Sequence, residues 1–170
     1  MKKIINNKYH LKDNEMTDVY TKVKLLIINS NHEILLAYQK NGYEFPGGTN
    51  EIGESLDQTV VRELEEETGI VLEMSHFEPF VCSLGYYKDW PQVGRNKKIE
   101  IYYYEVHTDL KPNYDNIHLT DDEKKGNFRL EYVPLDEFEN TLNRNTQQYG
   151  DERGIAREML ELFEIYKKSL

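Results

Sequence analysis

Short apolar segments separated by turn residues predict that most of this chain folds into strands. Residues 19–28 alternate between polar and apolar positions and then become continuously apolar, which is typical of a strand with a buried end. Clusters of Asn, Ser and Gly, such as residues 29–32 and 41–42, mark the turns. The expected strands are residues 19–28, 33–40, 43–48, 80–87, 99–107 and 128–133, with a further extended segment beginning at residues 70–72.

Helical periodicity appears in three places. Residues 55–68 carry one apolar stripe, begin with Ser55 and Gln58 at capping-box spacing, and are followed by Gly69 at the position of a C-terminal cap. A short helix is expected to open at residues 134–136 and a longer one to cover residues 151–168. Because helices interrupt a run of strands, the pattern indicates an α/β or α+β fold.

Composition narrows the class of protein. A length of 170 residues favours one domain, and residues 1–17 form a polar lead-in with room for one edge strand. Cys82 is the only cysteine, so it is expected to be a small buried residue and leaves no intrachain disulfide or cysteine-based zinc site. The apolar runs are too short for a membrane span, and the N-terminus lacks the apolar region of a secretory signal. These features favour a cytoplasmic protein.

The chain is strongly acidic. With 21 Lys and Arg against 31 Asp and Glu, its formal net charge is −10. Long-range repulsion therefore disfavours general nucleic-acid binding. A small phosphorylated ligand remains compatible with this charge, because a bound cation reverses the field locally.

Acidic side chains crowd the polar face of the 55–68 helix. Glu63, Glu66 and Glu67 stand at i, i+3 and i+4, and Glu65 adds a fourth charge. Like charges at this spacing destabilise a helix by roughly 0.2–0.5 kcal/mol per pair. A divalent cation would convert the repulsion into coordination, since Mg²⁺ binds carboxylate oxygens together with substrate phosphates. On this helix alone, the pattern favours a solvated face with Arg62 paired to Glu66, because runs of charge usually face water.

The residues before the helix favour the cation site. Residues 48–70, GTNEIGESLDQTVVRELEEETGI, fit the pattern G-x5-E-x7-R-E-U-x-E-E-x-G-U, where U is aliphatic, and EFPGG precedes them. This segment resembles the signature of the Nudix (MutT-like) hydrolases. The matching positions are Gly48, Glu54, Arg62, Glu63, Leu64, Glu66, Glu67, Gly69 and Ile70.

The resemblance implies a fold and a reaction. The fold would be a single-domain α/β/α sandwich around a mixed β-sheet over residues 18–170, with residues 48–70 forming a loop–helix–loop. The reaction would be hydrolysis of a nucleoside diphosphate linked to another moiety, by attack of water on phosphorus with Mg²⁺ or Mn²⁺. The substrate would be a small nucleotide: a nucleoside triphosphate, a dinucleoside polyphosphate or a nucleotide sugar. A homodimer is compatible with this class.

The resemblance also implies roles for individual residues. Glu66 and Glu67 would be the principal metal ligands, and Glu63 a ligand or the base for the attacking water. The remaining implied roles are a metal-binding carbonyl at Gly47, orientation of the carboxylates by Arg62, bracing of the loop by Glu54, and special backbone shapes at Gly48 and Gly69.

Family members often recruit one more acidic residue from the loop before the last core strand. That loop is residues 119–128, which makes Glu123 the expected further catalytic residue and metal ligand, with Asp122 next to it. Glu100, in the 99–107 strand, is a second candidate for the base. An exposed surface carboxylate remains the alternative for each of them.

One basic and aromatic segment is a candidate for substrate binding. Residues 84–98 carry Lys88, Arg95, Lys97 and Lys98 against Asp89, a local charge of +3, and also contain Tyr86, Tyr87 and Trp90. Aromatic faces can stack on a base, and cations can hold phosphates. Some relatives that cleave dinucleoside polyphosphates have a Tyr 16 to 18 residues past the signature, and Tyr86 and Tyr87 lie 16 and 17 past Ile70. Strand-end packing beside a solvated loop is the alternative.

Other functions remain open on this scaffold. A catalytically silent nucleotide-sensing module is the main alternative, although such a module would not need the complete set of Glu63, Glu66 and Glu67. An isomerase of prenyl diphosphates would require a reactive cysteine, whereas Cys82 lies in an apolar strand. RNA decapping is disfavoured by the net charge.

Overall fold

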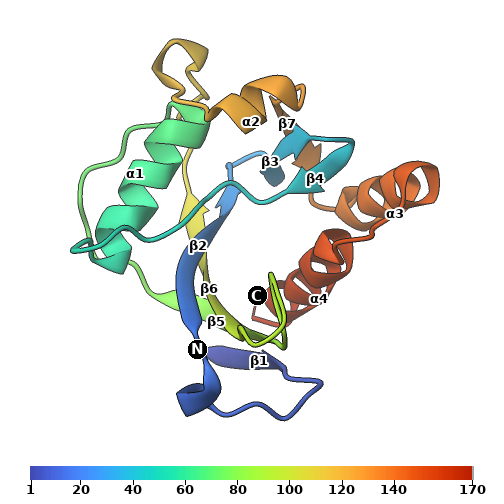
Figure 1. Ribbon diagram of the computed structural model, residues 1–170. Helices are drawn as coiled ribbons and strands as arrows, with labels where there is room; N and C mark the ends of the chain where they lie inside the picture. The colour runs from blue at the N-terminus through green and yellow to red at the C-terminus, as the bar shows by residue number, and fades with distance from the viewer. Residues whose placement is uncertain (170) are drawn as a thin grey trace.

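The structure is a computed structural model that describes residues 1–169, and the side chain of Asp122 lies outside its described part. One seven-stranded sheet runs in the order β1-β5-β6-β2-β3-β4, with β7 paired to β3 (Figure 1). The pairs β1–β5 and β2–β6 are parallel and the others antiparallel. The strands are β1 Lys2–Asn6, β2 Asp18–Ile28, β3 Glu33–Gln39, β4 Gly42–Glu44, β5 Pro79–Tyr87, β6 Lys97–His107 and β7 Arg129–Pro134.

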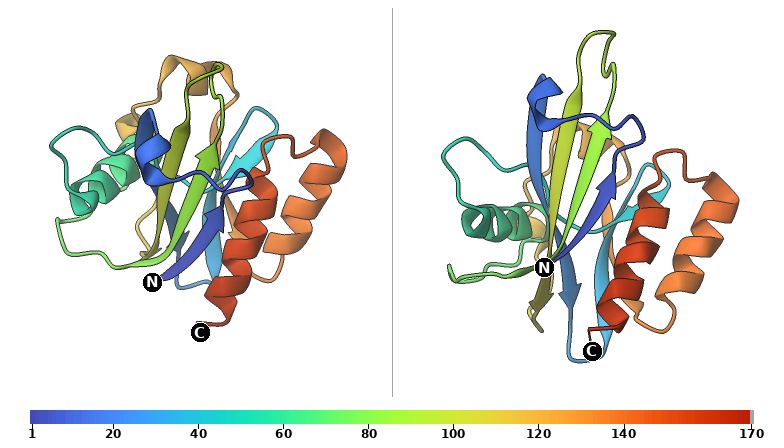
Figure 2. Two further views of the ribbon diagram at one scale, coloured as in Figure 1. Left: turned by 60° about the horizontal axis from the view of Figure 1, so that its bottom comes forward. Right: turned by 90° about the horizontal axis from the view of Figure 1, so that it is seen from below.

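Helices cover both faces of the sheet. Helix α1 (Leu56–Thr68) lies on one face, and α3 (Phe138–Tyr149) and α4 (Ile155–Lys167) lie on the other (Figure 2). Strand β2 serves both cores, because its residues 23, 25 and 27 pack toward α1 while residues 26 and 28 pack toward α3 and α4. This double burial explains the continuous apolar run. The expected single-domain α/β/α sandwich with a mixed sheet is confirmed.

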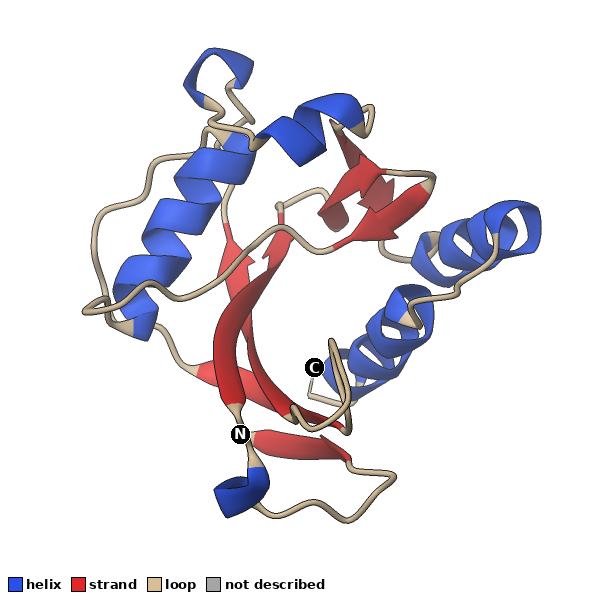
Figure 3. Cartoon of the chain, viewed as in Figure 1, coloured by secondary structure: helices blue, strands red, loops and turns tan. Residues whose placement is uncertain are grey.

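Several expected elements differ from the structure. The link between α1 and β5 contains no strand (Figure 3), because Ile70 and Leu72 bury their side chains against the α1 core from a loop. The helix expected to be short is the 12-residue α3, which Phe138 and Leu142 anchor in the core. A short helix, α2 (Asp121–Lys125), was not expected.

The N-terminal edge strand, the buried cysteine and the ends of helix α1 are as the sequence patterns predict. The edge strand expected within residues 1–17 is β1, and Cys82 is buried and unpaired with another cysteine. Among the described helices, none is long and apolar enough to cross a membrane. Helix α1 is fixed at both ends: Ser55 and Gln58 form the reciprocal capping box, and Gly69 ends the helix in the left-handed conformation with φ of 69°.

Gly69→Ala is expected to destabilise the fold by at least about 2 kcal/mol. Any side chain there combines left-handed strain with a Cβ that overlaps the Asn113 carbonyl oxygen. Gly53→Ala is the matched control, because Gly53 also has a positive φ but open space around its Cβ position. Urea unfolding of both variants distinguishes the cost of the left-handed conformation from the cost of the overlap with Asn113. Equal destabilisation would show that the Asn113 contact contributes nothing.

Candidate active site

The predicted carboxylates converge on one cavity of about 570 Å³ between α1, β2 and the segment before β7. That volume lies within the usual range for ligand pockets. Glu63, Glu66, Glu67 and Glu123 all line it, together with Arg62 and the backbone of Gly47 and Gly48. The 55–68 helix therefore presents its acidic face to this cavity.

Arg62 is the centre of the polar network. Its Nε donates to Glu54 Oε1 at 2.8 Å, and its Nη1 donates to Glu63 Oε1 at 2.8 Å and to Glu66 Oε2 at 2.9 Å. Its Nη2 donates to the Thr49 carbonyl at 2.9 Å, which ties the helix to the preceding loop. The Arg62 guanidinium lowers the pKa of Glu54 to about 2. Arg62 thus holds three carboxylates without donating to Glu67.

Arg62→Lys is expected to lower kcat by about 10²-fold on whichever nucleotide the protein hydrolyses. A lysine ammonium cannot reproduce the planar fork that fixes Glu63 and Glu66, and small displacements at a reacting centre are costly. Arg144→Lys is the control, since Arg144 on α3 makes an exposed ion pair with Glu137, the residue before that helix. Steady-state kinetics of both variants test this, and an unchanged kcat in Arg62→Lys would remove Arg62 from the positioning role.

Glu67 and Glu63 are held in poorly hydrated positions. The Gly47 N–H donates to Glu67 Oε2 at 2.8 Å, and burial raises the pKa of Glu67 to about 7. Burial also raises the pKa of Glu63, against the opposing effect of Arg62. A Cβ at Gly48 would overlap the Glu63 carboxylate, so this position requires glycine for close approach.

The two acidic candidates outside the signature, Glu123 and Glu100, lie in different places. Glu123 lines the cavity, and its carboxylate accepts from Thr120 N at 2.6 Å while its charge contributes to raising the pKa of Glu67. Glu100 does not line the cavity; its carboxylate pairs with Lys98 at 2.8 Å. Among the described carboxylates, Glu63 and Glu123 therefore remain candidates for the base. Asp122 was the neighbouring candidate, and its side chain lies outside the described part.

The aromatic and basic candidates lie farther along the sheet. The Tyr86 hydroxyl donates to Asp13 at 2.8 Å, and Arg95 pairs with Asp18 at 2.6 Å, so neither reaches the carboxylates. Tyr87 and Trp90 line a second cavity of about 840 Å³ between β1, the end of β5 and the start of α4. Tyr86 also borders it.

Several cavity residues had not been identified from the sequence, among them two lysines and a histidine. Lys22 and Lys24 of β2 line the carboxylate cavity, and so does His118. The lysines have a sequence signal, because charged residues at alternate positions of an apolar strand share one face. Nothing in the sequence distinguishes His118, whose backbone N–H donates to the Glu66 carbonyl at 2.8 Å.

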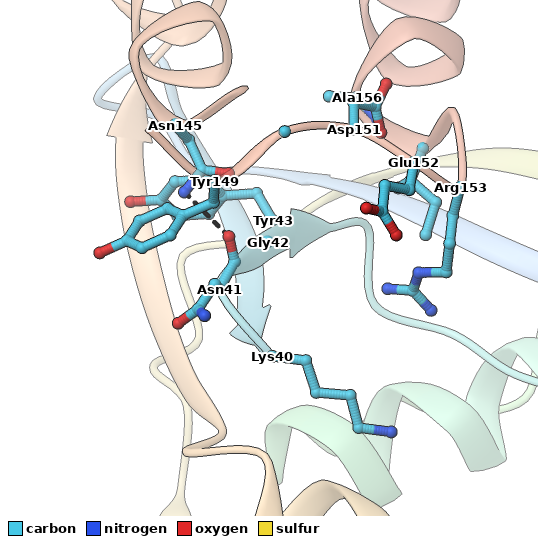
Figure 4. A pocket seen from close by; sticks show the side chains of 12 residues that line it. Lys40, Asn41, Gly42, Tyr43, Asn145, Tyr149, Asp151, Glu152, Arg153 and Ala156 are labelled. Carbon is cyan, nitrogen blue, oxygen red and sulfur yellow. Dashed lines mark hydrogen bonds between the residues drawn. The ribbon is translucent and has the colours of Figure 1, made fainter. Parts of the chain in front are cut away.

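A smaller cavity of about 250 Å³ lies between the β3–β4 turn and the α3–α4 link (Figure 4). There Asn145 donates to the Asn41 carbonyl at 3.2 Å. Arg153 lines this cavity and also the 840 Å³ one, and its Nη2 lies 3.6 Å from Oε1 of Glu44, which lines the carboxylate cavity. The link between α3 and α4 therefore adjoins the carboxylate site.

The donor chemistry fits a divalent cation. Carboxylate and carbonyl oxygens are the ligands that Mg²⁺ and Mn²⁺ take. Within the described residues, however, no three Asp, Glu, His or Cys side chains are arranged to hold a metal ion as they stand. Arg62 holds Glu63 and Glu66, and the Gly47 N–H holds Glu67. To hold a cation, these carboxylates would therefore have to turn toward it.

Comparison with known proteins identifies the family. The family model of the NUDIX domain matches residues 21–158, so the chain belongs to that family. The 8-oxo-dGTP diphosphatase of Escherichia coli K12 is 46% identical over 61 residues, which are 32% of this chain and 46% of that protein. The ADP-ribose pyrophosphatase of Methanocaldococcus jannaschii is 42% identical over 50 residues, 26% of this chain and 30% of that protein. The chain thus spans less than half the length of these curated relatives.

A solved structure supports the fold. The crystal structure of the MutT protein from Bacillus halodurans superimposes with a TM-score of 0.52 at 21% identity, over 71% of this chain and 72% of that one. At that identity the likeness concerns the arrangement of the sheet and helices.

Proposed function

We propose that this protein is a divalent-metal-dependent pyrophosphohydrolase that cleaves a nucleoside diphosphate linked to another moiety. The observation that carries the proposal is the convergence of Glu63, Glu66, Glu67 and Glu123 on one cavity. The names of the two curated relatives, a diphosphatase and a pyrophosphatase of nucleotides, support the same reaction class. A homodimer and a cytoplasmic location stay predictions from the sequence.

The chain's own residues suit this chemistry. Glu63, Glu66 and Glu67, with Glu123 and the Gly47 carbonyl, would hold the Mg²⁺ or Mn²⁺. When bound, the metal would neutralise phosphate charge and lower the pKa of a bound water. Lys22 and Lys24 bring positive charge to the same cavity, where phosphates require it. Glu63 or Glu123 would accept the proton of the attacking water, and Arg62 would keep Glu63 oriented.

A nucleotide panel tests the proposal. Turnover of nucleoside triphosphates, dinucleoside polyphosphates, nucleotide sugars and ADP-ribose is measured with Mg²⁺, with Mn²⁺ and with EDTA. We expect metal-dependent hydrolysis of at least one class, and ¹⁸O from labelled water then identifies the attacked phosphorus. Tight nucleotide binding without turnover in either metal would instead support the nucleotide-sensing module.

A further inference from the structure

A row of lysines leads away from the carboxylate cavity along the sheet. Lys24 and Lys22 alternate with Leu26 on β2, so they share the face that packs against α3 and α4. The Lys24 ammonium donates to the Phe45 carbonyl at 2.8 Å. Within the described residues, no hydrogen bond or ion pair of the Lys22 ammonium is present, although Lys22 is half-buried. Its charge is therefore available to a ligand.

The same face continues onto β6. Lys97 alternates with Ile101 and Tyr103, which pack toward α4, so Lys97 shares the face of Lys22. The positive charges of Lys24 and Lys97 both lower the pKa of Lys22, after the larger effect of burial. Three cationic side chains thus influence one stretch of the sheet, next to four carboxylates that would require a metal.

The row ends at two aromatic rings. The Lys97 ammonium lies 5.0 Å from the ring centroid of Tyr20 and 5.8 Å from that of Trp90. Tyr20 is 42% exposed and Trp90 54% exposed, so neither ring is taken up by the core. Trp90 also borders the 840 Å³ cavity, where Arg153 and Arg157 of the α4 region add positive charge.

The length of the row limits the ligand. Tyr20 and Lys24 are four residues apart on β2, which corresponds to about 13 Å at 3.3 Å per residue. A ligand that spans this distance must carry negative charge along its length, to match the lysines, and a flat ring at its far end, to stack on Tyr20 or Trp90. A nucleoside polyphosphate has both properties.

We propose that Lys22 and Lys97 bind the polyphosphate chain of an extended nucleoside polyphosphate, and that Tyr20 and Trp90 stack on its base. This inference rests on the proposed function, because the carboxylate cavity defines where the chain is cleaved.

Binding can be measured apart from catalysis. Trp90 is the only tryptophan, so its fluorescence reports directly on this end of the row. Adenosine 5′-tetraphosphate is titrated with Mg²⁺ into Glu67→Gln, whose turnover is expected to be slow, and into Glu67→Gln combined with Lys97→Gln. We expect a saturable change in emission, with a Kd at least tenfold weaker in the double variant.

Lys111→Gln is the matched control for Lys97→Gln. The Lys111 ammonium also lies over an aromatic ring at 5.8 Å, that of Tyr132, which is away from this row. In the Glu67→Gln background it should leave the Kd unchanged. No saturable change in emission, or an equal loss of affinity in both lysine variants, would overturn the inference.

Kinetics provide a second readout. In the otherwise wild-type chain, Lys97→Gln should lose at least tenfold in kcat/KM on ATP, adenosine tetraphosphate and diadenosine tetraphosphate, through a higher KM. Tyr20→Leu, at an exposed position, gives an independent variant should Lys97→Gln weaken β6. Hydrolysis with no dependence on these residues would overturn the inference while leaving the proposed function intact. Absence of hydrolysis on every nucleotide would contradict the proposed function itself.

Discussion

Glu67→Gln is expected to lower kcat by about 10³-fold with little change in the fold. The substitution keeps the size of the side chain and its acceptor for the Gly47 N–H, but removes the negative charge that would bind the metal. Loss of one electrostatic group at a reacting centre typically costs 10²–10³-fold, and a lost metal ligand belongs at the upper end. Steady-state turnover with saturating Mg²⁺ measures the effect.

Glu65→Gln is the control for this loss. Glu65 is on the same helix and is also acidic, but it does not line the carboxylate cavity. It should retain full activity. If Glu65→Gln and Glu67→Gln lost activity equally, the effect would come from the charge of the helix, and the proposed metal site would be wrong.

Local sequence patterns predicted the parts of the fold that local forces determine. The α1 helix carries its own start and stop signals in Ser55, Gln58 and Gly69, so its bounds could be read directly. Strand β2 was recognisable because both faces of its C-terminal half are buried. In contrast, residues 70–72 are apolar because they cover the α1 core from a loop, and an apolar run alone cannot distinguish that from a strand.

The candidate site likewise has one part that local spacing predicts and another that depends on the fold. The convergence of Glu63, Glu66 and Glu67 follows from helical spacing, and so does the contact of Arg62 with Glu66 at i+4. The Gly47 N–H, in contrast, reaches Glu67 only because the loop before the helix folds back over it. The separation of Glu123 from Glu100 depends on which segments the sheet brings together, and that information is not local. The polyphosphate row has the same origin, since Lys97 meets Tyr20 only through the parallel pairing of β6 with β2.

Glu67→Gln should also stabilise the metal-free protein at high pH. The pKa of Glu67 is about 7 in the folded state, against a usual value of 4.5. Between these values the folded protein retains a proton that the unfolded chain has released, so stability falls as the pH rises through this window. The loss is complete above pH 7 and amounts to roughly 3 kcal/mol.

A glutamine at this position carries no charge and escapes that cost. In EDTA the variant should therefore match the wild type near pH 4, below this window, and exceed its unfolding free energy by roughly 3 kcal/mol at pH 8, as measured by urea denaturation. With Mg²⁺ at pH 8 the wild type should instead be the more stable of the two. A cation that binds only the folded state stabilises it, and the variant lacks the carboxylate that would bind the cation. Equal stabilities at both pH values would show that the Glu67 carboxylate is well hydrated. The position would then have no unfavourable charge for a cation to relieve, and Glu67 would have no electrostatic need for a metal next to Gly47.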